Sequence, residues 1–149
     1  MKLKEKVHQS CLELCASRLK TLKKAMKAQQ EALEAESKSS AGDKYETSRA
    51  MAHLEQEKLA AQIEENIKQT RLLESIGSSM NKSKVSSGAF VRTDKGSFYV
   101  ASGLGRIEVD GIEIIAISPQ APLTQSMLGL EKGAMFTFNG IRRTILELE

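Results

Sequence analysis

The distribution of glycine and proline divides this chain into two parts of different character. Residues 1–76 contain one glycine, Gly42, and no proline, whereas residues 77–149 contain the other nine glycines and both prolines. Long stretches without these residues favour helices, and stretches rich in them favour strands joined by turns. The sequence therefore predicts an α+β protein with a helical arm over residues 1–77, a polar linker over 78–87 and a β module over 88–149.

The arm is predicted to be an antiparallel coiled coil. Residues 3–37 and about 44–76 are rich in strong helix formers, and their apolar residues are spaced by three and four. In the first helix the expected seam is Leu3, Val7, Leu14, Cys15, Leu19, Leu22, Met26 and Leu33. In the second helix the expected seam is Met51, Leu54, Ala61, Ile63, Ile67, Leu73 and Ile76. Two such helices joined by a short Ser/Gly segment fold back on each other, which puts the tip of the arm at residues 38–46.

The β module is predicted from three hairpin patterns and one short helix. Asp-Lys-Gly at 94–96, Asp-Gly at 110–111 and Asn-Gly at 139–140 each separate two strand-like segments. Between the last two hairpins, Pro122 suits the first turn of a helix and Gly129 suits its end. The pattern predicts a small antiparallel sheet with one helix packed on it.

Charge and cysteine content limit the partners and the compartment. Residues 1–40 carry nine Lys and Arg against five Asp and Glu, whereas residues 41–77 carry five against seven. The two helices should therefore attract each other and leave positive charge for an anionic partner. The chain has no long apolar run, and its start, MKLKEKVHQS, lacks the apolar core of a signal peptide. Together with only two cysteines, this predicts a reduced, cytoplasmic protein that does not bind a membrane.

His8, Cys11 and Cys15 share one face of the first helix. These residue types bind zinc, but the only other histidine is His53 on the second helix, so a fourth ligand is missing. Cysteine is also among the most buried residue types. We expect these three residues to pack in the interior.

The tip carries two carboxylates three residues apart, Asp43 and Glu46. A polar residue followed by Glu three positions later is the pattern of a helix capping box. Carboxylate oxygens are also the ligands that Mg²⁺ prefers, and residues at i and i+3 project to one side of a helix. Capping and metal binding are compatible, and the residues alone leave both open.

The order of these parts, with the segments SPQAPLTQSMLG and GDKYE, resembles the Gre transcript-cleavage factors of bacterial RNA polymerase. The resemblance covers nearly the whole chain. It implies that the C-terminal module is FKBP-like and docks on the polymerase, while the coiled coil enters the secondary channel. It also implies an accessory factor, expected as a monomer, rather than an enzyme with its own active site.

The resemblance assigns roles to particular residues. Asp43 and Glu46 fall on the family's catalytic tip acids, which help hold a Mg²⁺ ion shared with the polymerase active site, near the 3′ end of the nascent RNA. Residues implied to contact the partner are Tyr45, Arg49, Pro119, Pro122, Leu128 and Gly129. Tyr45 could stack near a base or pack on the tip, and Arg49 could pair with Glu46 or contact phosphate.

A basic stripe on the first helix is a candidate RNA contact. Its residues are Lys20, Lys23, Lys24 and Lys27, at positions i, i+3, i+4 and i+7. Such a stripe would bind the phosphate backbone electrostatically. It is equally typical of the solvated outer face of a coiled coil.

Two alternatives to transcript cleavage stay open. Thr47, Arg49 and Ala50 depart from the pattern that follows the tip acids in the family, which favours a factor that regulates pausing or initiation without cleavage. A coiled-coil structural adaptor, in which the tip acids are only helix caps, is the other alternative.

Overall fold

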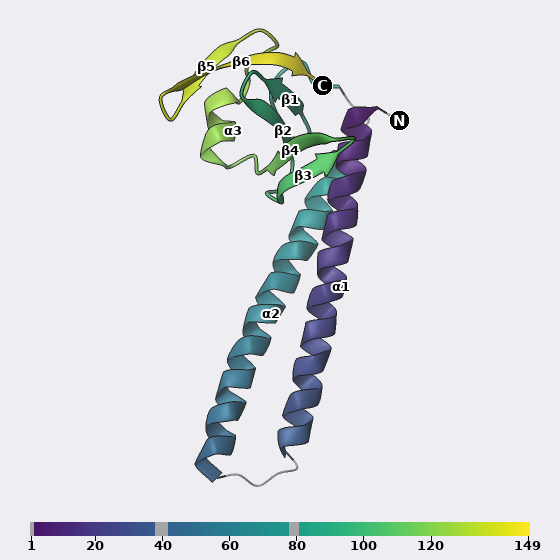
Figure 1. Ribbon diagram of the computed structural model, residues 1–149, viewed down its shortest axis with the longest axis vertical. Helices are drawn as coiled ribbons and strands as arrows, with labels where there is room; N and C mark the ends of the chain where they lie inside the picture. The colour runs from purple at the N-terminus through teal and green to yellow at the C-terminus, as the bar shows by residue number, and fades with distance from the viewer. Residues whose placement is uncertain (1, 38–41, 78–80) are drawn as a thin grey trace. The chain divides into compact units, whose positions relative to one another are not determined.

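The computed structural model describes residues 2–37, 42–77 and 81–149, and the side chains at positions 36, 37 and 42–45 lie outside the described part. The elements are α1 (Leu3–Ser37), α2 (Gly42–Ile76), β1 (Phe90–Thr93), β2 (Gly96–Val100), β3 (Gly105–Val109), β4 (Ile112–Ile117), α3 (Pro122–Met127), β5 (Met135–Phe138) and β6 (Ile141–Leu148) (Figure 1). The predicted α+β class, with two long helices, three hairpins and a short helix, is confirmed. No helix in the described ranges is long and apolar enough to cross a membrane.

The chain forms two compact units that do not follow the order of the sequence. One unit combines Met1–Glu13 with Gln69–Glu149, and the other is Leu14–Lys68. We call the first the sheet unit and the second the arm unit. The sheet unit therefore contains the start of α1 and the end of α2 as well as all six strands.

In the arm unit, the α1 side of the seam agrees with the prediction. Cys15 is fully buried, and Leu19, Leu22, Met26, Gln29 and Leu33 are half-buried. Buried Asn66 on α2 donates a hydrogen bond from Nδ2 to the backbone carbonyl of Cys15 at 3.0 Å. Gln29 donates from Nε2 to the carbonyl of Ala52 at 3.5 Å. These contacts join the two helices in antiparallel order.

The α2 side of the seam differs from the prediction. Met51 and Leu54 are 66% and 65% exposed and Ala61 is also exposed, so placing them in the seam was wrong. Positions that are buried or half-buried follow a 4-3 repeat instead: Ala52, Gln56, Leu59, Ile63, Asn66, Thr70 and Leu73. The prediction included Ile63 and Leu73 of this repeat, and both are confirmed as seam positions. It missed the others partly because three of the seven residues are polar, and a search for apolar spacing gives polar residues no weight.

The sheet has the strand order β3-β4-β2-β1-β6-β5. All neighbouring pairs are antiparallel except β2 and β4, which run parallel. The β3–β4 and β5–β6 turns have positive φ at both central residues, with Asp110 at 53° and Asn139 at 52°. This is the geometry expected of Asp-Gly and Asn-Gly hairpins. The parallel pair was not part of the predicted antiparallel module, because it joins strands from two different hairpins.

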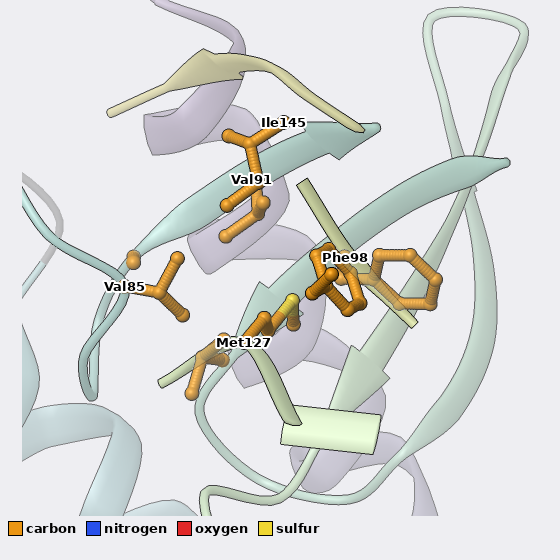
Figure 2. Close-up of a cluster of buried hydrophobic side chains, with 8 residues drawn as sticks. Val85, Val91, Phe98, Met127 and Ile145 are labelled. Atoms are coloured by element: carbon orange, nitrogen blue, oxygen red, sulfur yellow. The ribbon is translucent and has the colours of Figure 1, made fainter. Parts of the chain in front are cut away.

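One face of the sheet carries the main hydrophobic core. Figure 2 shows Val85, Val91, Phe98, Met127 and Ile145 converging in this cluster. Met127 comes from α3 and Val85 from the segment 78–87 that the sequence predicts to be a linker. Val85 is tied in by backbone hydrogen bonds of 2.8 Å to Gly129 and Leu130. This part of the predicted linker is therefore integrated into the fold.

The opposite face of the sheet is covered by the ends of the two long helices. Phe90, Tyr99, Ile114 and Ala116 share this face by strand register and are all buried. The first turns of α1 lie beside β3 and β4 (Figure 1), where Lys6 forms a 2.8 Å ion pair with Asp110. Ser102 donates a hydrogen bond to the carbonyl of Gln69 in α2 at 2.8 Å. The sheet unit is thus a three-layer arrangement of α3, sheet and helix ends.

Candidate functional site at the start of the second helix

The tip acids lie in the first turn of α2. Because α2 begins at Gly42, Asp43 and Glu46 occupy positions close to its N-terminus, where acidic side chains are stabilised by the helix dipole. The side chain of Glu46 is exposed, whereas those of Asp43 and Tyr45 lie outside the described residues. Glu46 is therefore available to another molecule, and the backbone places Asp43 less than one turn away from it.

A hollow of about 170 Å³ lies one to two turns from Glu46. It is lined by Leu33 and Glu34 of α1 and by Arg49 and His53 of α2. Arg49 and His53 are four residues apart, so they occupy the same side of α2. Among these four residues, the sequence predicts a partner contact only for Arg49 and a seam position only for Leu33. The i, i+4 spacing to His53 was visible in the sequence, whereas the position of Glu34 depends on how the two helices pair.

The basic stripe has the exposure that either interpretation requires. Lys20, Lys23, Lys24 and Lys27 are all exposed on α1, while Leu22 and Met26 between them are half-buried. Four cations within two turns create a local positive potential that attracts polyanions. The arrangement is compatible with an RNA contact, which stays a prediction.

The predicted contacts on the sheet unit lie at the two ends of α3. Pro122, Leu128 and Gly129 are exposed and Pro119 is half-buried. The loop before α3 is held in place by hydrogen bonds from Thr124 Oγ1 to the Ser118 carbonyl and from Gln125 Nε2 to the Pro119 carbonyl, both at 2.7 Å. The helix ends at Met127, and the next residue, Leu128, has extended backbone with ψ of 133° and is 46% exposed. Gly129 follows with φ of +81°. A loop that is already ordered loses little entropy when it binds a partner.

The donor chemistry of the tip suits Mg²⁺, which takes oxygen ligands and is often bound by only one or two protein carboxylates. Among the residues that the structure describes, no group of three or more His, Cys, Asp and Glu side chains is placed to hold a metal ion. His8, Cys11 and Cys15 are buried, and the two cysteines are thiols rather than a disulfide, in line with the packing role expected for these residues. Asp43 and Glu46 thus stay the candidate metal ligands on the grounds of sequence and donor type.

Comparison with known proteins identified no relative. No family model matches the chain, and no similar curated protein or solved structure was found. The resemblance to the Gre factors therefore rests on the sequence segments quoted above and on the order of the elements.

Proposed function

We propose that this protein is a Gre-like factor that binds bacterial RNA polymerase and stimulates the polymerase's own cleavage of backtracked RNA. The observation that carries the proposal is the pair of acids in the first turn of α2, close to the connection between α1 and α2, which have 35 residues each. A pair at this place is at the end of an arm, where it can reach an active site in another molecule. The SPQAPLTQSMLG segment, which contains α3 and has exposed residues at both ends of this helix, supports a docking role for the sheet unit.

In this proposal the chain supplies ligands and orientation, and the polymerase supplies the reaction centre. Mg²⁺ shared with the polymerase would activate a water molecule for hydrolysis of the phosphodiester bond. Asp43 and Glu46 would hold the ion, and the N-terminus of α2 would stabilise their negative charge. Exposed lysines of the basic stripe would contact RNA phosphates, which makes binding sensitive to salt.

Regulation of pausing or initiation without cleavage is the second candidate. The position of Arg49 favours this second candidate, because Arg49 follows Glu46 by three residues. Arg49 also lines the nearby hollow together with His53. A guanidinium near the acids would compete with a metal ion for the carboxylate. In a structural adaptor, by contrast, the acids would act only as caps.

The test uses halted, backtracked elongation complexes of the cognate polymerase with end-labelled RNA and Mg²⁺. We expect the wild-type protein to shorten the RNA and the Asp43→Asn/Glu46→Gln variant to do so at a rate reduced by about 10²-fold or more, because amides are poor Mg²⁺ ligands. The matched control is Glu55→Gln/Glu57→Gln, which makes the same change in net charge at two other exposed acids of α2. It should cleave like the wild type.

Binding is measured in parallel by co-sedimentation with the polymerase. If both the wild type and the tip variant bind but neither shortens the RNA, the protein is a non-cleaving regulator. If the wild type does not bind the polymerase at all, the proposal as a whole is wrong.

A further inference from the structure

A buried hydrogen bond joins the first helix to the sheet. His8 Nδ1 on α1 lies 2.7 Å from the hydroxyl oxygen of Tyr99 on β2. The two rings meet edge to face, with centroids 5.9 Å apart. His8 is 7% exposed and Tyr99 is fully buried, so water does not compete for this contact.

The groups around His8 disfavour a positive charge on its ring. Burial lowers the pKa of His8, and the nearby charge of Lys4 lowers it further. Lys4 is itself buried, one turn earlier on α1, and its own pKa is lowered by burial and by Lys82, with an opposing effect from Glu149. From the sheet side the facing group is Tyr99, whose pKa is raised by burial and by Cys11. The phenol therefore keeps its proton beside a neutral imidazole, and the tautomer of His8 sets which of the two groups donates the hydrogen bond.

The other contacts that hold this face do not use His8. Lys6 and Asp110 form their ion pair at the surface, with both side chains about half exposed. Val7 and Cys11 contribute buried surface. Exposed ion pairs add little stability, so burial and the His8–Tyr99 contact hold the helix on the sheet.

We propose that the packing of the first turns of α1 on the sheet is coupled to the protonation of His8, holding while the imidazole is neutral and loosening when it is protonated. Protonated His8 would place a second cation next to Lys4 and would bury a charged ring where water does not reach it. Both changes oppose the packed state within the sheet unit. This device is independent of the proposed function, since neither the tip acids nor a partner takes part.

The sign of the effect follows from the direction of the pKa change. The packed state holds the pKa of His8 below its ordinary value of about 6.5, so it binds fewer protons than the released state. Above that pH both states have a neutral ring and the packing is at its strongest. As the pH falls below 6.5, the ratio of released to packed helix rises by up to about tenfold per pH unit. This rise stops once the pH falls below the pKa of His8 in the packed state.

The experiment uses the full chain with His53→Gln, which leaves His8 as the only histidine. The ring of His8 is titrated by NMR, and hydrogen exchange of residues 3–13 is measured between about pH 5 and pH 8 with correction for intrinsic exchange. We expect the ring to titrate below its ordinary range and exchange in this segment to rise as the pH falls. In His8→Gln, which keeps a hydrogen-bonding side chain without a titrating group, the corrected exchange should be independent of pH.

Two further variants protect the test against simple destabilisation. Tyr99→Phe should speed exchange at every pH yet keep the pH dependence, because burial of His8 remains. Lys6→Met should change exchange by the same factor throughout the range. The proposal is overturned if His8→Gln keeps the wild-type pH dependence, or if the ring of His8 titrates at its ordinary value while exchange stays constant.

Discussion

Gly88 is a residue whose identity is dictated by one close contact. Its backbone has φ of +91°, and its N–H donates to the carbonyl of Val100 at 2.6 Å. A Cβ atom added at this position would lie 2.6 Å from Cγ2 of Ile76, the last residue of α2. Any side chain would therefore meet both backbone strain and a steric clash. The end of α2 and the start of the β strands can approach this closely only because position 88 is glycine.

We predict that Gly88→Ala destabilises the protein by about 2–4 kcal/mol, combining the cost of positive φ with that of overpacking. The matched control is Gly105→Ala, which has a similar φ of +84° but no atom within 4 Å of the added carbon. The control should cost only about 1–2 kcal/mol. Urea denaturation followed by circular dichroism measures the free energy of unfolding of both variants. Equal losses of stability would show that Ile76 moves aside and that the close contact adds no penalty.

At the scale of the element, α2 shows how polar residues can set the register of a helix pair. Its buried repeat includes Gln56, Asn66 and Thr70. Asn66 donates from Nδ2 to a backbone carbonyl of α1, and this hydrogen bond compensates the burial of its amide nitrogen. A polar residue at one seam position specifies register at some cost in stability. Met51 and Leu54 face solvent although they are more apolar than the residues that replace them in the seam.

We predict that Met51→Lys/Leu54→Lys changes the free energy of unfolding by less than about 0.5 kcal/mol per site, because both side chains are exposed. Leu59→Ala should cost about 2–4 kcal/mol, because Leu59 is 7% exposed and lies in the seam. Thermal and urea unfolding by far-UV circular dichroism distinguishes the two. A large loss of stability in the double lysine variant would contradict this result and would support the seam expected from apolar spacing.

At the scale of the whole molecule, the sheet unit is assembled from both ends of the chain. The face formed by Phe90, Tyr99, Ile114 and Ala116 is buried although it points away from the main core. Its cover comes from residues 1–13, which the whole arm unit separates from the strands in sequence, and from residues 69–77, which come shortly before β1. Folding of the sheet unit therefore requires contacts between segments that are distant in sequence, which slow folding.

We predict that a fragment of residues 81–149 is much less stable than the same strands in the full chain, because an apolar sheet face would be exposed. The fragment should bind a hydrophobic dye and unfold at a lower urea concentration than the full chain. Adding a peptide of residues 1–13 alone would be an informative control, since it restores His8 and Lys6 without the end of α2. A fragment as stable as the full chain, with no dye binding, would contradict this account.

Much of the candidate site was visible in the sequence. Asp43 and Glu46 stand out because these two acids directly follow the Ser/Gly segment that separates the two helices. The four lysines of the basic stripe stand out by their helical spacing. Glu34 and Leu33 could not be associated with Arg49 in this way, because the hollow that they share depends on the pairing of α1 with α2. The link between His8 and Tyr99 was equally invisible, since the two residues are 91 positions apart.

The sequence by itself determined the secondary structure of this protein. The bounds of both long helices and all three hairpins follow from local causes: the absence of Gly and Pro, and turn residues such as Asp110 and Asn139 that tolerate positive φ. The tertiary structure decided which helix face forms the seam, that β2 and β4 pair in parallel, and that Val85 and the first turns of α1 complete the sheet unit. These outcomes depend on burial and hydrogen bonds between distant segments, and such energies have no counterpart in local residue spacing.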